Sequence, residues 1–340
     1  MTKGDNKMTK IIITGGAGFI GSHFAKYIQK HYPKWEIAVI DCLSYAGDRR
    51  NLEGVKHQFF NMSICQYPEL VSVIRDADYI VNFAAESHVD NSIKDCDPFI
   101  ETNIRGVKNL LNCCRFLRDR SDRYKLKKFI QISTDETYGS RQKYLIDEGG
   151  RQILNPNFHA KETEILRPGN AYSATKAAAD MICSAYLNTW GLPIIIVRPV
   201  NNYGSHQFPE KFIPATIRRI IKGKPALIYD TGEEERDWLF VEDCCEAVDL
   251  VLQKGEIGQI YNIGAQEHHT NNQIVKHMFA NLNKEERIIY RPNARPGHDR
   301  SYAVDCGKIE RLGWRKRHNF DDMFPRVVDW YAKKFRTLAK

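Results

Sequence analysis

Two short stretches of the sequence carry side chains that can transfer protons. The stretch "STDETYG" places Thr134, Asp135 and Glu136 side by side after an apolar run. The stretch "AYSATKAAAD" places Tyr172 and Lys176 one helical turn apart, so that on a helix the phenol and the ammonium share a face. A nearby ammonium stabilises a phenolate, so we expect the pKa of Tyr172 to fall from about 10 towards neutrality. Such a phenolate can remove the proton of a hydroxyl group.

Each stretch also has a plainer interpretation. Tyr-x-x-x-Lys patterns are common and usually belong to surface side chains, and an acidic pair at a strand end usually faces solvent. In a perfect strand, Asp135 would point to the face opposite Thr134 and Glu136. The chain must therefore leave strict alternation here if all three side chains are to reach one ligand.

A glycine-rich stretch, "TGGAGFIG", follows the first expected strand and opens a helix. Its spacing fits GxxGxxG through Gly15, Gly18 and Gly21, and it also fits GxGxxG when Gly16 replaces Gly15. Such glycines allow a tight turn and the close approach of a pyrophosphate to the helix N-terminus. The stretch therefore predicts a dinucleotide site.

The next expected strand ends at Asp41, 20 residues after Gly21. A carboxylate at this point suits a ribose 2'-hydroxyl and repels a 2'-phosphate, which favours NAD over NADP. Arg49 and Arg50 lie close by in the sequence and keep NADP open. With NAD bound, the positively charged nicotinamide would help Lys176 to lower the pKa of Tyr172.

Strands and helices alternate through the first two thirds of the chain. Continuous apolar runs predict five strands, "KIIITGG", "EIAVID", "ADYIVNFAA", "KKFIQIST" and "LPIIIVRP", and one stripe of a predicted helix contains Ile104, Val107, Leu110, Leu111, Cys114 and Leu117. This order predicts an α/β fold with a doubly wound, Rossmann-type parallel sheet. Prolines then become frequent, which indicates a smaller mixed α/β lobe. "WLFVEDCCEAVDLVLQKG" and "GQIYNIG" predict a helix and a strand that return to the first lobe.

We therefore expect two interleaved domains. Residues 8–200 and about 238–263 would bind NAD, residues about 201–237 and 264–340 would bind the substrate, and residues 1–7 would form a flexible tail.

Composition is ordinary for a soluble protein of 340 residues, with 42% hydrophobic and 27% charged residues. No apolar run is long enough to span a membrane, and no signal peptide is recognisable, so we expect a cytoplasmic protein. None of the nine cysteines forms a CxxC pair, and the adjacent pairs Cys113-Cys114 and Cys244-Cys245 indicate buried small side chains rather than a metal site. The net charge of +8 and the cluster "RKRH" leave nucleic-acid binding as a minor alternative to a solvated basic surface.

The motifs resemble those of the extended short-chain dehydrogenase/reductase family. "FAAESHVDNSI", "RPVNNYG", "FPEKFIP", "RDWLFVEDCCEA", "YNIG" and "RPGHDRSYAVD" join those above, and together they are similar to the nucleotide-sugar 4,6-dehydratases that act on dTDP-glucose or UDP-glucose. The resemblance runs from about Lys10 to Trp314. It implies NAD as cofactor, no metal, no nucleic-acid or membrane partner, and a homodimer. Two helices per subunit, the one near residues 101–118 and the one with Tyr172, would form a four-helix interface.

The resemblance also implies roles. Tyr172, with Lys176, would deprotonate the hydroxyl at carbon 4 while NAD accepts the hydride, and Thr134 would hydrogen-bond that oxygen. Glu136 would take the proton at carbon 5, and Asp135 would protonate the hydroxyl leaving carbon 6, before hydride returns to carbon 6. The product would be a 4-keto-6-deoxyglucose nucleotide of rhamnose-type biosynthesis. The two carboxyl groups need opposite protonation states.

Further positions follow from the same resemblance. Matches to cofactor contacts are Gly15, Gly18, Phe19, Ile20, Gly21, Asp41, Ala84, Glu86, Thr102, Tyr172, Lys176 and Asn202. Matches to substrate contacts are Ser87, Thr134, Asn201, Lys211, Phe212, Tyr229, Arg236, Asn271, Arg295 and His298, the arginines suiting a diphosphate. His88 and His206 are expected to be structural or peripheral rather than catalytic.

The sequence departs from the family's usual motifs at three places, and two alternative functions remain. "NMS" at Asn61 to Ser63 replaces the usual adenine-side pair, and "NARPGH" and "PALIY" differ where the substrate base is read, so thymidine and uridine stay open. A nucleotide-sugar 4-epimerase would use Tyr172 without needing Asp135 or Glu136. A non-catalytic NAD-binding regulator, attached to nucleic acid through the basic tail, would need neither.

Overall fold

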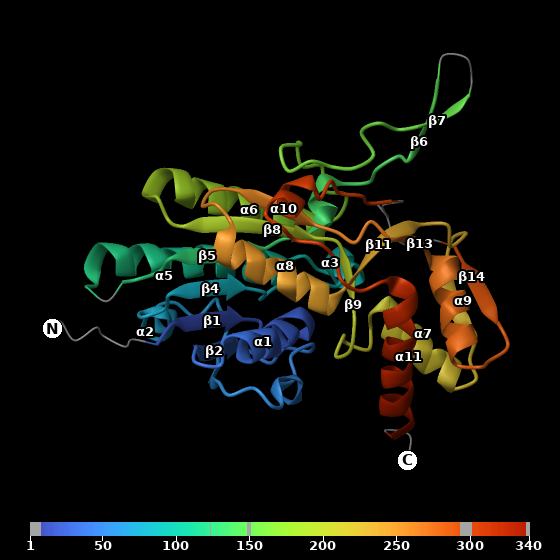
Figure 1. Cartoon of the computed structure of the whole chain (residues 1–340), viewed down its shortest axis with the longest axis horizontal. Helices are drawn as coiled ribbons and strands as arrows, with labels where there is room; N and C mark the ends of the chain where they lie inside the picture. Colours follow the sequence, from blue (N-terminus) through green and yellow to red (C-terminus); the bar gives the residue numbers. More distant parts are fainter. Residues whose placement is uncertain (1–7, 123, 148–150, 293–300, 338–340) are drawn as a thin grey trace.

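A seven-stranded parallel sheet forms the centre of the computed structural model, which describes residues 8–122, 124–147, 151–292 and 301–337 (Figure 1). The strands lie in the order β12-β8-β5-β4-β1-β2-β3. Their bounds are β1 (Lys10–Thr14), β2 (Glu36–Asp41), β3 (Gln58–Asn61), β4 (Tyr79–Asn82), β5 (Lys128–Ile132), β8 (Ile194–Pro199) and β12 (Ile260–Ile263). All five predicted apolar runs are strands of this sheet, and the predicted α/β fold class is confirmed.

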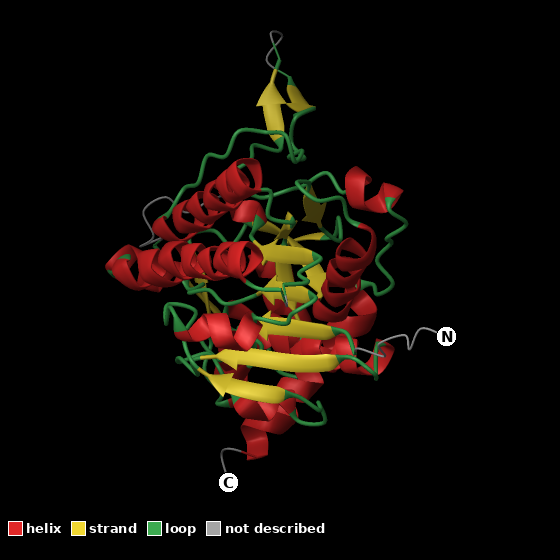
Figure 2. Cartoon of the chain, turned by 90° about the vertical axis from the view of Figure 1, so that its left-hand side faces the viewer, coloured by secondary structure: helices red, strands yellow, loops and turns green. Residues whose placement is uncertain are grey.

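Helices cover both faces of the sheet, as Figure 2 shows for the strands between two helical layers. The helices of one face are α1 (Phe19–His31) and α8 (Val241–Lys254), and those of the other are α2 (Glu69–Ile74), α5 (Val107–Arg120) and α6 (Ala171–Trp190). Within β1, Ile11 and Ile13 join the α1 side of the core while Ile12 joins the α5 side. Burial on both faces explains why the strands read as continuous apolar runs.

The helix predicted near residues 101–118 begins in an unusual geometry. Residues Ile100–Gly106 form a π-helix, η2, and α5 continues from Val107. Four short segments lie elsewhere around the sheet: η1 (Arg49–Leu52), α3 (Val89–Lys94), α4 (Asp97–Phe99) and the 3-10 helix η3 (Asp135–Tyr138). The predicted stripe is buried from Val107 to Leu117, whereas Ile104, within the π-helix, is half-buried.

Smaller sheets and further helices build the second lobe and one projection. A three-stranded sheet contains β9 (Asn201–Tyr203), β11 (Glu235–Phe240) and β13 (His268–Thr270), and a parallel pair contains β10 (Ala226–Tyr229) and β14 (Ile288–Arg291). The helices are α7 (Phe212–Ile221), α9 (Asn271–Asn281), α10 (Gly307–Arg311) and α11 (Phe320–Thr337). A hairpin of β6 (Tyr144–Ile146) and β7 (Gln152–Leu154) projects from the body (Figures 1 and 2).

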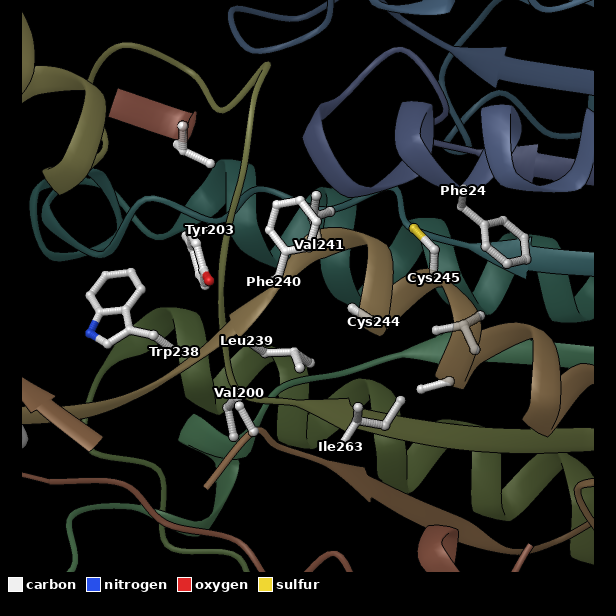
Figure 3. Packing of buried hydrophobic residues seen from close by; sticks show 14 of the residues in the cluster. Phe24, Val200, Tyr203, Trp238, Leu239, Phe240, Val241, Cys244, Cys245 and Ile263 are labelled. Carbon is white, nitrogen blue, oxygen red and sulfur yellow. The ribbon is translucent and has the colours of Figure 1, made fainter. Parts of the chain in front are cut away.

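The chain returns from the second lobe to the large sheet, and one detail of that return corrects the sequence prediction. The run predicted as a helix from Trp238 begins as strand β11, because Trp238 to Phe240 pair with β9, and the helix α8 starts at Val241. Figure 3 shows Leu239 and Phe240 beside Cys244 and Cys245 in the shared core.

The predicted strand "GQIYNIG" is β12, which pairs with β8 at the edge of the large sheet. One hydrophobic cluster extends from α1 and α8 to α7, α9 and α11 of the second lobe. We keep the division into residues 8–200 with about 238–263, and about 201–237 with 264–340, as a proposal. The predicted tail lies outside the described residues.

The cysteines are free thiols, and both adjacent pairs are buried as expected. In the described ranges no helix combines the length and the apolar character that a membrane crossing requires. Within those same ranges, no group of three or more His, Cys, Asp or Glu side chains is arranged to hold a metal ion.

Candidate active site

One cavity of about 640 Å³ lies where strands β1, β2, β4, β5 and β8 end, and it extends to the second lobe. Every predicted site residue within the described ranges lines it. These are Gly15, Gly18, Phe19, Ile20, Gly21, Asp41, Ala84, Glu86, Ser87, Thr102, Thr134, Asp135, Glu136, Tyr172, Lys176, Asn201, Asn202, Lys211, Phe212, Tyr229, Arg236 and Asn271. The predicted residues Arg295 and His298 lie outside the described residues.

The glycine turn has the close packing that a dinucleotide loop requires. Gly15 has a φ of +66°, and a Cβ there would come within 2.6 Å of the Ala84 nitrogen. A Cβ on Gly21 would come within 2.3 Å of the Gly15 oxygen, whereas one on Gly18 would meet only that oxygen, at 3.2 Å. Gly16 faces the core against Val39, so the pattern that serves the cavity is Gly15-x-x-Gly18-x-x-Gly21.

The N-terminus of α1 points its backbone donors into this turn. Gly18 is the N-cap residue, no side chain caps the helix, and the first turn contains no acidic residue. The positive end of the helix dipole is therefore not neutralised locally, which fits a pyrophosphate.

Asp41 is held rigidly beside the turn. Its carboxylate accepts hydrogen bonds from the backbone N–H groups of Ala17 at 2.9 Å and Leu43 at 2.8 Å. Burial raises its pKa, and these two hydrogen bonds oppose that change. A carboxylate in this position fits a ribose hydroxyl. Arg49 stacks on Phe59, and the other arginine of the pair, Arg50, is bound to the carboxylate of Asp48, so both guanidiniums are engaged away from the cavity.

The acidic stretch leaves the strand before its side chains reach the cavity. Strand β5 ends at Ile132, and Thr134 caps the 3-10 helix η3, which begins at Asp135. The Thr134 hydroxyl donates to Asp135 Oδ1 at 3.2 Å and accepts from the Glu136 N–H at 3.3 Å. This turn replaces the alternation of a strand, and it is how all three side chains line one cavity.

Asp135 is the most deeply enclosed carboxyl group of the site. Its side chain is buried, and Oδ2 has no hydrogen-bond partner among the described residues. Burial raises its pKa well above the usual range, the charges of Glu136 and Asp237 raise it further, and Thr134 and Arg236 oppose the rise. Asp135 therefore favours the protonated form, in which a carboxyl group can donate a proton.

The Tyr172–Lys176 pair differs from the expectation that the lysine lowers the pKa of the phenol. The Lys176 ammonium donates to the Ile132 carbonyl at 2.5 Å. Burial raises the pKa of Tyr172, Glu136 and Asp135 raise it further, and a hydrogen bond with Thr134 opposes them. The chain alone thus disfavours the phenolate, first because the phenol is buried and second because two carboxyl groups lie near it. Burial also lowers the pKa of Lys176 to about 8, and Asp180 opposes that change.

Residues of the second lobe meet those of the first across the cavity. The Lys211 ammonium, just before α7, donates to the Ser87 carbonyl oxygen at 2.8 Å. Arg236 lies over the ring of Tyr302 at 4.8 Å, and Asn271 donates to Glu234 at 3.1 Å. Cationic and amide groups are thus arranged opposite the acidic segment, as an anionic, hydroxyl-rich ligand requires.

Sequence reasoning missed Asn103, which organises the segment after β4. Its buried amide accepts from the Glu86 N–H at 2.9 Å and donates to the Glu86 carbonyl oxygen and to Thr175, both at 3.0 Å. The residue lies in the π-helix η2, and helical periodicity gave no signal for it; π-turns are frequent at functional sites. His88 lines the cavity, while His206 does not and instead bonds to Asn51.

Known proteins share these features along most of the chain. The sequence matches the pattern of the GDP-mannose 4,6 dehydratase family over residues 12–327. The dTDP-glucose 4,6-dehydratase of Neisseria meningitidis is 39% identical over 344 residues, covering 95% of this chain and 93% of that protein. A trifunctional Arabidopsis thaliana protein, named in part UDP-glucose 4,6-dehydratase, is 36% identical, and the match covers 96% of this chain and 48% of that protein.

A solved structure agrees with them. DesIV, a dTDP-glucose 4,6-dehydratase from Streptomyces venezuelae crystallised with NAD, is 37% identical and has a TM-score of 0.86, covering 96% of this chain and 97% of that one. The family pattern covers most of the chain, and the cavity holds both a dinucleotide turn and a carboxyl pair. The chain therefore belongs to the nucleotide-sugar 4,6-dehydratases and is an NAD-dependent hydro-lyase.

Proposed function

We propose that the chain converts dTDP-glucose to its 4-keto-6-deoxy derivative. The observation that carries this proposal is the segment of Thr134, Asp135 and Glu136, which lines the same cavity as Tyr172. The relatives that the chain matches nearly end to end include dTDP-glucose 4,6-dehydratases. UDP-glucose is the second candidate, because a relative named for that substrate is 36% identical.

The first step is oxidation at carbon 4 of the glucose. NAD, which the glycine turn and Asp41 would hold, would supply the acceptor and later the donor of a hydride, together with a positive charge near the phenol. Tyr172 accepts the proton of the hydroxyl at carbon 4. Thr134, which lines the same cavity as Tyr172, orients the oxygen of that carbon.

The second step is elimination of water across carbons 5 and 6. The new ketone acidifies the hydrogen at carbon 5, and Glu136, the less buried carboxyl group, removes that proton. The carbon–oxygen bond at carbon 6 then breaks, and Asp135 donates its proton so that water leaves. The raised pKa of Asp135 supports this division of roles, because an acid must hold its proton near neutral pH. Carbon 6 is afterwards reduced and carbon 5 reprotonated.

The two rival functions explain less of the site. A 4-epimerase oxidises and reduces one carbon and has no use for a buried, protonated Asp135. A nucleic-acid-bound regulator would need a free basic surface. In the cluster near the C-terminus, Lys316 pairs with Glu267 at 2.6 Å and Arg317 with Glu246 at 2.5 Å.

We also propose a homodimer through α5 and α6. Met181 of α6 is 55% exposed and Phe116 of α5 is 40% exposed. Ala174 and Ala185, also exposed, continue the stripe along α6 and would allow a second helix to approach closely. A two-fold axis would place the same surface of both subunits in contact.

The substrate proposal predicts a 4-keto-6-deoxy product from dTDP-glucose, with slower turnover of UDP-glucose. One missing methyl group is worth about 1–3 kcal/mol in a pocket, so we expect a ratio of roughly 10- to 200-fold in kcat/KM. Product analysis with dTDP-glucose, UDP-glucose and GDP-mannose in parallel provides the measurement. Turnover of GDP-mannose alone would refute the choice of sugar nucleotide, and a 4-epimer without deoxygenation would refute the reaction.

The role of Glu136 predicts a split between the two steps. Glu136→Gln keeps the size of the side chain but removes the base, so elimination should slow by roughly 10²- to 10⁴-fold while oxidation continues. Stopped-flow absorbance should then show reduced nicotinamide accumulating. Glu69→Gln, an exposed change in α2, serves as the control and should leave both rates unchanged. Normal elimination in Glu136→Gln would show that another group is the base.

The cofactor assignment predicts selective protection of a thiol. Cys42 and Cys96 are both exposed, but only Cys42 lines the cavity, directly after Asp41. Saturating NAD should slow the reaction of Cys42 with a thiol reagent at least about 10-fold, since a bound ligand blocks access to the cavity, and leave Cys96 unchanged. Peptide mass spectrometry resolves the two sites. Equal labelling with and without NAD would place the adenosine half elsewhere.

The dimer proposal predicts that Met181→Arg produces monomers at micromolar concentration, because two charges would be buried face to face. Ile289→Arg, at a site 46% exposed on β14 of the second lobe, is the matched control. Light scattering after size-exclusion chromatography gives the mass. A dimeric Met181→Arg protein, or a monomeric native chain, would contradict this interface.

A further inference from the structure

A buried ion pair lies behind the acidic segment and outside the lining of the cavity. The Asp180 carboxylate is completely buried, and the Arg198 guanidinium is 1% exposed. Asp180 Oδ2 accepts from Arg198 Nε at 3.0 Å and lies 2.9 Å from Nη2. Asp180 is on α6, one turn beyond Lys176 and two turns beyond Tyr172, while Arg198 is in β8. The pair therefore belongs to the framework that carries the oxidation residues.

Both ends of the acidic segment are tied to this pair. At the start, the Ser133 hydroxyl donates to Asp180 Oδ2 at 3.0 Å. At the end, Arg198 Nη1 donates to the Tyr138 hydroxyl at 2.8 Å. Ser133 precedes Thr134, and Tyr138 is the last residue of η3, so every residue proposed for elimination lies between these two ties.

The Tyr138 hydroxyl also reaches a third element. It donates to Asn262 Oδ1 in β12 at 2.8 Å, and the Asn262 amide donates to the Ala160 carbonyl oxygen at 2.9 Å. The Asn262 N–H donates in turn to Glu162 Oε1 at 3.1 Å. Tyr138 is therefore fixed from two sides, by Arg198 and by Asn262.

We propose that the Asp180–Arg198 pair, acting through Ser133 and Tyr138, is a positioning device that holds the elimination residues in register with Tyr172 and Lys176. The proposal rests on the roles assigned above to Asp135 and Glu136. Ser133, Tyr138, Asp180 and Arg198 are positioning residues in this account, because they act on the substrate only through the segment that they hold.

The physical need for such a device follows from the length of η3. A 3-10 helix of four residues has little stability of its own, so its orientation must come from tertiary contacts. Elimination needs an acid and a base placed on two neighbouring carbons, and a misplacement of about 1 Å can cost about 10²-fold in rate. A buried ion pair is a weak source of stability, but its many directed hydrogen bonds can select one arrangement.

Tyr138→Phe removes the hydroxyl that joins Arg198 to Asn262 and keeps the ring. We expect elimination to slow about 10- to 100-fold while oxidation changes less than about 3-fold, so that reduced nicotinamide accumulates after mixing with dTDP-glucose. The two rates come from stopped-flow absorbance and from quenched-flow analysis of the 4-keto-6-deoxy product.

Tyr261→Phe is the matched control. Tyr261 is also buried, lies next to Asn262 in β12, and gives its hydroxyl to a single bond from the Glu256 N–H at 3.1 Å. The Tyr261→Phe variant should lose thermal stability as Tyr138→Phe does, but it should keep the native ratio of the elimination rate to the oxidation rate. Equal ratios in both variants would reduce Tyr138 to a structural residue and overturn the proposal.

Ser133→Ala tests the other tie and remains informative if Tyr138→Phe does not fold. Hydrogen–deuterium exchange should be faster in the peptide that covers residues 133–139 and unchanged in α8. Unchanged exchange together with a native rate ratio in Ser133→Ala would also overturn the proposal. The native chain separates this failure from that of the proposed function. If the native chain forms no 4-keto-6-deoxy product, the proposed function is refuted. If it forms the product and the variants keep the native ratio of elimination to oxidation rates, only the positioning role is refuted.

Discussion

The site depends on the common direction of the seven strands, because parallel strands deliver their following residues to one edge of the sheet. Strand β1 delivers the glycine turn, β4 the segment that holds Glu86, and β5 the acidic segment. The central strands are mostly apolar on both faces, so most of the polar groups that line the cavity come from the ends of strands or from the residues that follow them. Near this edge the backbone departs from regular strand and α-helix geometry in three short segments: a glycine at positive φ, a π-helix and a 3-10 helix.

Charge within the cavity imposes a second constraint. Burial raises the cost of ionising Asp135, and the nearby charges of Glu136 and Asp237 raise it further. Glu136 and Asp135 likewise oppose ionisation of Tyr172. One buried environment thus favours the protonated forms of both Asp135 and Tyr172, and a positively charged ligand beside the phenol would oppose that effect at Tyr172.

The sequence predicted structure correctly where a residue's role depends on its neighbours in the chain. The spacing of Gly15, Gly18 and Gly21 and the apolar runs depend on local backbone geometry, and both were found where predicted. It failed where tertiary pairing decides. Trp238 begins no helix, because β9 offers a strand partner, and Lys176 turns to the Ile132 carbonyl, which lies on another element. Asn103 gave no signal at all, since an amide inside a helical pattern looks like surface.

The division between elements also shows why the proposed positioning contacts would be needed. The proposed oxidation groups on α6 and the proposed elimination groups on η3 would act on carbons 4, 5 and 6 of one sugar, yet they come from segments more than 30 residues apart in the chain. Backbone pairing cannot link them, because η3 is not a strand and α6 is already satisfied internally. Side chains must do so, and a charged pair with several donors can bind both segments at once. An enzyme that reacts at one carbon only, such as a 4-epimerase, does not need two separate elements to be held in a fixed relative position.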